Sequence, residues 1–130
     1  MTEGQLEHVN ITVSDPQRSA ALLRDLFGWQ IRWEGPSMAS GHTIHIGTDN
    51  SYVALYTNPE VQRADPDFRK GEPMNHIGVT VDDLDAVEAR VVAAGLKPFG
   101  HDDYDPGRRF YFFDWNGIEF EVVSYAPEQR

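Results

Sequence analysis

The chain contains an internal repeat, and this repeat constrains the possible fold more than any other feature. Residues 8–21, HVNITVSDPQRSAA, align with residues 76–89, HIGVTVDDLDAVEA, so that His8 falls on His76. Each copy starts with alternating apolar residues, which are typical of a strand. An aspartate and an amphipathic helical pattern follow. We therefore expect two similar half-domains, each too small to be stable alone.

The pattern after each helix predicts that both copies have the same order of elements. Each helix is expected to end at a glycine, Gly28 or Gly95, because a left-handed residue commonly closes a helix. Three β-rich stretches then follow, at about 29–34, 42–48 and 51–57 in the first copy and 96–100, 108–114 and 117–125 in the second.

This order predicts an α+β fold made of two βαβββ modules that share one core. The modules should form a curved mixed sheet around a cleft, with the helices on its outer face. We expect a single domain over residues 1–130, with modules at 5–58 and 75–126 and a polar linker at 59–74.

The alternation also predicts which side chains face away from the helices. In the strands that begin at His8 and His76, and in the strand at 117–125, the apolar residues share one face. The opposite face carries the two histidines together with Glu119 and Glu121. Two histidines and one carboxylate form the facial triad that binds Fe(II), and the same set accepts Mn, Ni or Zn. A metal site is one interpretation of this face, and hydrogen-bonded structural histidines are the other.

Composition excludes several classes of function. The 21 Asp and Glu against 11 Lys and Arg give a formal charge of −10, and the densest basic cluster is Arg108 and Arg109, so neither nucleic acid nor an anionic membrane is an expected partner. The apolar runs are too short to span a membrane, and the N-terminus lacks the regions of a signal peptide, so we expect a cytoplasmic location. Because the chain has no cysteine, a metal site here must use nitrogen and oxygen ligands.

Three segments of the sequence resemble the vicinal oxygen chelate superfamily, which groups glyoxalase I, bleomycin-resistance proteins, methylmalonyl-CoA epimerase, extradiol dioxygenases and metal-dependent fosfomycin-resistance enzymes. The resemblance spans about residues 5–125, in EHVNITVSDPQRSAALLRDLFGWQ, NHIGVTVDDLDAVEARVVAAG and FYFFDWNGIEFEVVSY. The last segment is similar to the D-P-D-G-x-x-x-E stretch of the family, with Asp114 at its head and Glu121 as its carboxylate. These motifs specify the superfamily well and the reaction poorly.

The resemblance implies a divalent metal ion held by the first and last strands of the modules. Carried over to this sequence, the implied ligands are His8, His76 and Glu121. When Asn50 is aligned with Asn116, the fourth ligand position is Leu55, which cannot bind a metal. Three ligands leave open positions for water and substrate oxygens, as in extradiol dioxygenases and fosfomycin-resistance enzymes.

The resemblance also suggests acid–base groups. Glyoxalase-type chemistry needs a carboxylate base, for which Glu119 is the obvious candidate, and its structural alternative is a solvated carboxylate. Extradiol dioxygenases use a cavity histidine, for which His45 is a candidate, and its alternative is a satisfied strand histidine. No role is assigned to His42, His101, Arg108 and Arg109.

Three functions remain open. The first is a metal-dependent enzyme that binds two neighbouring oxygens of a small metabolite, with lyase, isomerase, transferase or ring-cleaving oxygenase chemistry. The second is a metal-free binding protein of the bleomycin-resistance type, since an acidic chain with many aromatic residues suits a cationic aromatic ligand. The third is a module that only dimerises. The histidine and glutamate set favours the enzyme, and the resemblance implies a homodimer.

Overall fold

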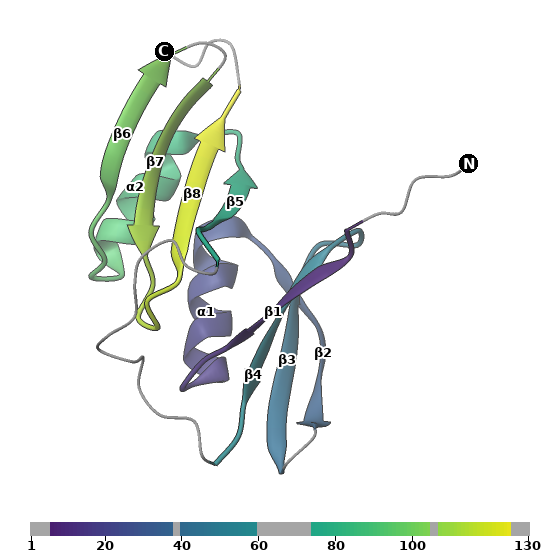
Figure 1. The fold of residues 1–130 in the computed structure, drawn as a ribbon. Coiled ribbons are helices and arrows are strands. Elements are labelled where there is room, and N and C mark those ends of the chain that lie inside the picture. The colour runs from purple at the N-terminus through teal and green to yellow at the C-terminus, as the bar shows by residue number, and fades with distance from the viewer. Residues whose placement is uncertain (1–5, 38–39, 60–73, 105–106, 126–130) are drawn as a thin grey trace. The chain divides into compact units, whose positions relative to one another are not determined.

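The computed structural model describes residues 6–37, 40–59, 74–104 and 107–125. The chain divides into two compact units, which we call the first unit (residues 1–63) and the second unit (residues 64–130). Within the described residues, each unit has one helix and one four-stranded mixed sheet, so the α+β class and the two βαβββ modules are confirmed (Figure 1). The strands lie in two separate sheets, one in each unit. Most of the linker expected at 59–74 lies outside the described residues.

The first unit consists of β1 (His8–Thr12), α1 (Pro16–Phe27), β2 (Gln30–Ser37), β3 (Gly41–Gly47) and β4 (Tyr52–Thr57). Its sheet has the order β1-β4-β3-β2. Strand β1 pairs with β4 in parallel, and the other pairs are antiparallel. The helix connects β1 to β2, so that β1 and β4 become neighbours although they are far apart in the sequence.

The second unit repeats this arrangement with β5 (Ile77–Thr80), α2 (Leu84–Ala93), β6 (Phe99–Tyr104), β7 (Gly107–Phe113) and β8 (Glu119–Ser124). Its sheet has the order β5-β8-β7-β6, and β5 pairs with β8 in parallel. The strand expected at 96–100 begins later, at Phe99. The residues directly after α2 are still bonded to the helix, since the backbone N–H of Leu96 donates to the carbonyl of Val91.

The helix boundaries follow the predicted signals. Asp15 and Asp83 cap the two helices, since their carboxylates accept hydrogen bonds from the backbone N–H of the residue three positions on. Gly28 closes α1 with a left-handed φ of 70°. In α2 the cap is Ala94, and Gly95 directly after it takes the left-handed conformation, with a φ of 85°. The second helix therefore ends slightly before the expected glycine.

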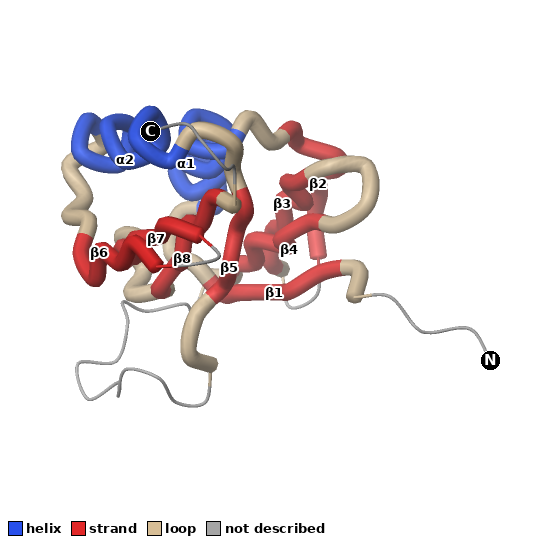
Figure 2. Tube along the Cα trace, turned by 90° about the horizontal axis from the view of Figure 1, so that it is seen from above, coloured by secondary structure: helices blue, strands red, loops and turns tan. Residues whose placement is uncertain are grey.

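Each helix packs on the apolar face of its own sheet. Helix α1 contacts β3 and β4, and α2 contacts β7 and β8; Figure 2 shows α2 on one side of the strands β6, β7 and β8. The largest fully buried side chains of the core are Phe110, Phe112, Phe120, Leu26, Ile44, Ile46 and Leu55. Because strand residues alternate between faces, burying this set against the helices leaves His45, Glu119 and Glu121 on the opposite faces of the sheets. None of the described helices is long and apolar enough to span a membrane.

Candidate metal centre

The second unit brings two of the predicted metal ligands together. His76 immediately precedes β5, and Glu121 lies in β8, the parallel neighbour of β5, where it is in register with Gly78. The distance from His76 Nε2 to Glu121 Oε1 is 3.0 Å. Their side chains are 31% and 14% exposed, so a ligand can still reach the imidazole while the carboxylate is mostly covered.

A second contact orients the His76 ring. Its Nδ1 lies 2.8 Å from Oδ1 of Asn75. In the tautomer that donates this hydrogen bond, Nε2 carries a lone pair that points toward the carboxylate of Glu121. Two lone pairs at this distance repel each other unless a cation lies between or beside them. The ring is thus oriented with Nε2 toward the carboxylate.

The spacing of this pair fits a metal ion. Two ligand atoms that each lie about 2.1 Å from a metal and meet at a right angle are about 3.0 Å apart. The observed Nε2–Oε1 separation of 3.0 Å is compatible with adjacent ligands in an octahedral shell, and equally with an ordinary hydrogen bond such as that of the His42–Glu34 pair at 2.9 Å. Two ligands alone do not make a protein site, and within the described ranges no group of three or more His, Asp or Glu side chains is placed to hold a metal.

Arg109 completes the polar cluster in the second unit. Its Nη1 donates a hydrogen bond of 2.8 Å to Oε2 of Glu121, and the two side chains are 13% and 14% exposed. A carboxylate this well covered is costly without a partner of opposite charge, and the guanidinium supplies one. No role for Arg109 could be assigned from the sequence. The feature that indicates its partner is the strand pairing. Arg109 on β7 pairs with Val123 and so lies diagonally across from Glu121.

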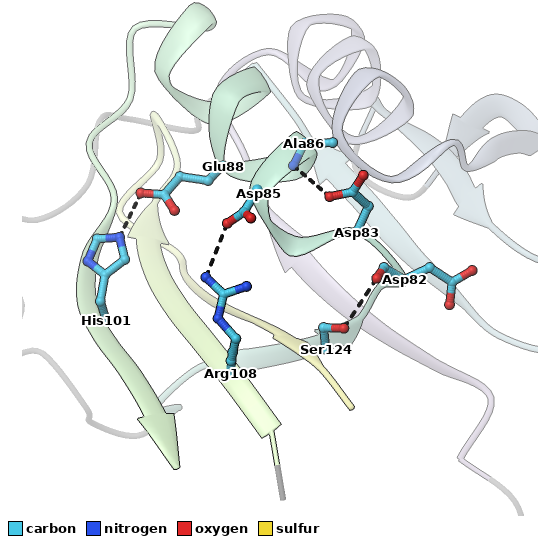
Figure 3. A network of polar contacts seen from close by, with 8 residues as sticks. All are labelled: Asp82, Asp83, Asp85, Ala86, Glu88, His101, Arg108 and Ser124. Atoms are coloured by element: carbon cyan, nitrogen blue, oxygen red, sulfur yellow. Dashed lines mark hydrogen bonds and ion pairs between the residues drawn. The ribbon is translucent and has the colours of Figure 1, made fainter. Parts of the chain in front are cut away.

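Two other ion pairs of the second unit connect the helix α2 to its sheet. His101 Nε2 lies 2.6 Å from Oε2 of Glu88 on α2, and Arg108 donates to Asp85 on the same helix at 3.2 Å (Figure 3). Figure 3 shows both contacts bridging from the strands to the helix. His101 and Arg108, which have no role assigned from the sequence, thus make contacts between strand and helix.

The pair in the first unit is similar. His42 Nε2 lies 2.9 Å from Oε2 of Glu34, and Gln17 on α1 donates to the same oxygen. These two hydrogen bonds lower the pKa of Glu34. His42 is therefore part of a contact between α1 and the sheet, on the face opposite to His45.

The predicted ligand of the first unit, His8, has surroundings that resemble those of His76. Its Nδ1 lies 2.9 Å from Oε1 of Glu7, so in both histidines the side chain of the preceding residue contacts Nδ1. The His8 ring stacks on Tyr52 at 4.8 Å between centroids. The structure thus places His8 in the first unit and the other two predicted ligands, His76 and Glu121, in the second.

The fourth ligand position was predicted wrongly. In β1 and β4 Asn10 pairs with Ala54, and the equivalent pair in the second unit is Gly78 with Glu121. The counterpart of Glu121 is therefore Ala54 and not Leu55, which is buried in the core. Alanine has no donor atom in its side chain, so the first unit still lacks a carboxylate at this position.

This error of one residue comes from the turns. In the first unit residues 48–51 connect β3 to β4, whereas residues 114–118 connect β7 to β8 in the second, which is one residue more. Gly117 accommodates the longer turn with a left-handed φ of 82°. The alignment of Asn50 with Asn116 did not allow for this extra residue, so the predicted register of the last strand was shifted by one residue.

Asp114, the head of the predicted motif, shapes the longer turn. Its Oδ1 accepts hydrogen bonds from the backbone N–H of Asn116 at 2.8 Å and of Ile118 at 2.9 Å. Burial raises the pKa of this carboxyl group, and the two backbone hydrogen bonds oppose that rise. Asp114 therefore sets where β8 begins, and with it the position of Glu121.

The two predicted acid–base residues lie in different units. Glu119 is buried in β8, on the same face as Glu121, so it is not a solvated carboxylate. His45 is half-buried in β3, in ring contact with Trp33 at 5.0 Å and with Tyr52 at 4.5 Å. Burial lowers the pKa of His45, and the nearby positive charges of His8 and Arg32 lower it further. At neutral pH its imidazole is therefore uncharged.

Comparison with known proteins identifies the family. Residues 5–122 match the Glyoxalase/Bleomycin resistance protein/Dioxygenase superfamily. No curated protein matches the sequence. Solved structures share the fold at low identity. A glyoxylase/bleomycin resistance protein/dioxygenase domain from Frankia sp. EAN1pec has a TM-score of 0.81 and 19% identity, over 95% of this chain and 99% of that one.

Two fosfomycin resistance proteins are also similar in fold. FosX from Listeria monocytogenes, solved with Mn(II) and sulfate, has a TM-score of 0.71 and 18% identity, over 99% of this chain and 98% of that one. FosX from Mesorhizobium loti has a TM-score of 0.68 and 24% identity, over 94% and 91%. With the repeat, the two βαβββ units and a match over most of its length, this chain belongs to the glyoxalase/bleomycin resistance protein/dioxygenase superfamily.

Proposed function

We propose that the protein is a divalent-metal-dependent enzyme that binds a small metabolite through two neighbouring oxygens. The proposed ligands are His8, His76 and Glu121. The observation that carries the proposal is that His76 and Glu121, two of the ligands that the family resemblance implies, contact each other in the second unit, with Nε2 3.0 Å from Oε1. His8 joins the set because it occupies the repeat position of His76 and has the same type of contact at Nδ1.

When bound, the metal would act as a Lewis acid that stabilises negative charge developing on the substrate oxygens. The residues of the chain prepare for this chemistry. Asn75 holds the His76 ring in one orientation, and Arg109 holds the carboxylate of Glu121. Neutral His and a single carboxylate leave open positions for the oxygens of a substrate.

The proposed acid–base groups are Glu119 and His45. Glu119 lies two residues before Glu121 on the same face of β8 and is buried, and a carboxylate is the type of group that can take a proton from a substrate. His45 is uncharged at neutral pH because burial lowers its pKa, so its imidazole can accept a proton.

Relatives support the choice of a divalent metal and of a substrate with two neighbouring oxygens. One structure of a FosX mutant from Listeria monocytogenes contains Mn(II) and 1S,2S-dihydroxypropylphosphonic acid, which carries two adjacent hydroxyl groups. Its fold is similar to that of this chain, with a TM-score of 0.71 and 19% identity. We carry over the metal class, with Fe, Mn, Ni or Zn as candidates, and not the compound.

A metal-free binding protein is the second candidate, and the aromatic cluster of the first unit favours it. Trp33 is 47% exposed and contacts His45, which stacks on Tyr52. The guanidinium of Arg32 lies 4.4 Å from the centre of the Tyr52 ring. Exposed aromatic rings bind planar ligands, but a cation already lies over Tyr52, which disfavours a cationic ligand at that ring.

Metal content distinguishes the two candidates. Protein without an affinity tag is purified without chelators, its metal is quantified, and the apoprotein is reloaded with Mn(II), Fe(II), Ni(II) or Zn(II). The enzyme proposal predicts about one bound ion per chain in the wild type, and loss of that ion in His76→Ala. The matched control is His101→Ala, which removes a histidine paired with a carboxylate on α2 and should leave metal content unchanged. A wild type that retains and rebinds no metal would support the metal-free candidate.

The same preparation tests the oligomeric state. We propose a homodimer, as the family resemblance implies, and the exposed Trp33 on the edge strand β2 offers an apolar side chain for the contact. Sedimentation velocity of the wild type should give a dimer, and a monomer at all concentrations would contradict this part of the proposal.

A further inference from the structure

A β-bulge in β2 changes which side chains lie on the face of the first sheet that is turned away from α1. Ile31 pairs with Ile46 of β3. Trp33 pairs with His45, so that Arg32 is the extra residue of the bulge. In a regular strand Ile31 and Trp33 would share a face. The bulge turns Trp33 to the other face, where its ring lies 5.0 Å from that of His45.

The bulged residue, Arg32, places a positive charge on this same face. Its guanidinium carbon lies 4.4 Å from the centre of the Tyr52 ring, and Tyr52 stacks on His45 at 4.5 Å. Arg32 is exposed, and within the described ranges no carboxylate forms an ion pair with it. The nearby Glu34 lies on the other face, where Gln17 of α1 donates to it. The guanidinium is therefore available to an anionic ligand.

The indole of Trp33 is held in place by the glycine two residues on. A Cβ at Gly35 would lie 2.8 Å from Cζ2 of Trp33, so the six-membered ring of the indole lies directly against the backbone of β2. Only glycine permits this close approach. Trp33 is nevertheless 47% exposed. The ring is thus ordered on one side and accessible on another, which lowers the entropic cost of binding a ligand on it.

The second unit has the two rings without the cation. By strand register Phe99 is the counterpart of Trp33, and Tyr111 is the counterpart of His45. This ring pair is retained, with 5.9 Å between centroids. The bulge of β6 follows Phe99 instead of preceding it, and the residue before Phe99 is a proline. The repeated scaffold therefore does not itself require a positive charge at this place.

We propose that this face of the first unit binds a planar anion of the aromatic carboxylate class, with its ring on Trp33 and its carboxylate at Arg32. Aromatic rings stack on an exposed indole, and a guanidinium forms charge-assisted hydrogen bonds with a carboxylate. Arg32 and Trp33 are adjacent in the chain, so one small molecule can contact both. The inference requires no bound metal, since it concerns the ligand of the aromatic cluster and not the residues His76 and Glu121.

The charges near the cluster agree with this ligand class. Apart from His8, the charged groups that act on His45 are the guanidinium of Arg32 and the carboxylate of Glu7. Glu7 contacts Nδ1 of His8, whereas Arg32 contacts only a neutral ring among the described residues. The overall charge of −10 disfavours anions at long range, so binding must depend on the short-range contact with Arg32.

The test follows the indole N–H signals of the three tryptophans by ¹H–¹⁵N NMR, in the full-length apoprotein with EDTA present. Trp33→Leu identifies the signal of Trp33. The signal of Trp115, which is 37% exposed, is the internal control for non-specific binding. Three probes are titrated: 2-naphthoate as a planar anion, 2-naphthylmethylammonium as a planar cation and cyclohexanecarboxylate as a non-planar anion. Arg32→Met is compared with Arg24→Met, which removes an exposed arginine of α1.

We expect 2-naphthoate to shift the Trp33 signal more than the other indole signals, and to bind about fivefold or more tightly than either other probe. Arg32→Met should weaken 2-naphthoate binding about fivefold, and Arg24→Met should leave it unchanged. Equal shifts at Trp33 and Trp115, equal affinity for the planar cation, or wild-type affinity in Arg32→Met would overturn the inference. So would a Trp33 signal that responds to protein concentration and not to the probe, because a second copy would then cover the ring. A wild type that binds no metal would overturn the proposed function and leave this inference standing.

Discussion

The two units share one scaffold but differ at the positions that matter for chemistry. Strand register matches Ala54 to Glu121, Thr43 to Arg109, His45 to Tyr111 and Tyr52 to Glu119. The first unit thus has a small apolar residue and a threonine where the second has Glu121 and its arginine, and the ring of Tyr52 in the first unit's aromatic cluster stands where the second has Glu119.

This difference shows how a repeated fold can carry different polar groups at equivalent positions of its two halves. The helices, the strand order and the apolar faces are retained in both units, so the backbone offers the same positions twice. A few side chains on the face away from the helices then decide the chemistry. In this chain the second unit has the covered ion pair of Arg109 with Glu121 beside His76, and the first has His8 in a stack of rings.

The largest expected effect on stability comes from making the second unit resemble the first. Glu121→Ala removes one partner of a covered ion pair, so the free energy of unfolding of the apoprotein should fall by about 2 to 3 kcal/mol. Arg109→Thr should also lower the free energy of unfolding, because it removes the other partner of this ion pair. The double variant should lose less than the sum of the two, by about 1 to 2 kcal/mol, because the partners interact. Urea unfolding at neutral pH measures all three.

The contrast with Arg108 tests whether that coupling is specific. Arg108 is more exposed and pairs with Asp85, so Arg108→Thr should cost less than about 1 kcal/mol. Additive losses in the double variant of Glu121 and Arg109 would show that the ion pair contributes nothing to the folded state and would remove the main energetic difference between the units.

The hairpin turns of the two units should also differ in how much they contribute to stability, by a somewhat smaller amount. Asp114→Ala removes two hydrogen bonds to backbone N–H groups and should lower the free energy of unfolding by about 1 to 3 kcal/mol. In the shorter turn of the first unit the exposed Thr48 plays this part with its hydroxyl, which accepts from Asn50 N at 3.2 Å. Thr48→Ala should therefore cost less than about 1 kcal/mol. Equal losses in the two variants would contradict the distinct role of the longer turn.

Asp114 also predicts a pH dependence. Because its pKa in the folded state is raised above the ordinary value of 3.8, the folded state binds this proton more tightly than the unfolded state. The resulting stabilisation is fully present below pH 3.8 and is lost as the pH rises through the folded-state pKa. Asp114→Asn keeps an acceptor but cannot titrate. The stability of the wild type relative to Asp114→Asn should thus decrease as the pH rises from about 4, and a constant difference would contradict the raised pKa.

The smallest effect concerns His45 and its counterpart Tyr111. The pKa of His45 is lowered from 6.5 chiefly by burial, so the unfolded state takes up this proton first as the pH falls. Its contribution to stability is present above pH 6.5 and is lost as the pH falls through the folded-state pKa, by less than about 1 kcal/mol. His45→Phe keeps an aromatic ring and should flatten the stability profile below pH 6.5, whereas Tyr111→Phe should retain the slope of the wild type.

The fold could be predicted from the sequence because its signals are local. Alternating apolar residues define the strands, and the aspartates at 15 and 83 start the helices, as their capping hydrogen bonds confirm. The register of the last strand was less predictable. The longer turn with the left-handed Gly117 moves β8 by one residue, and two asparagines at similar places in the two turns gave no sign of it.

The candidate site could be predicted only in part. Alternation placed Glu121 on the face away from the helix, and the structure shows His76 beside it. The partner of Arg109 could not be predicted, because the nearby acidic residues offered several carboxylates and only the pairing of β7 with β8 selects Glu121. The ligand set with His8 stays a prediction.

Equilibrium titration of the apoprotein with Mn(II) or Zn(II) tests the central claim most directly. We predict one site per chain in the wild type and a loss of about 100-fold or more in affinity in Glu121→Gln, because a neutral amide is a much weaker ligand. Glu88→Gln, which alters the carboxylate beside His101, should bind as the wild type does. If Glu121→Gln binds metal as tightly as the wild type, or if the wild type binds none, the account of the second unit as the metal-binding half is contradicted.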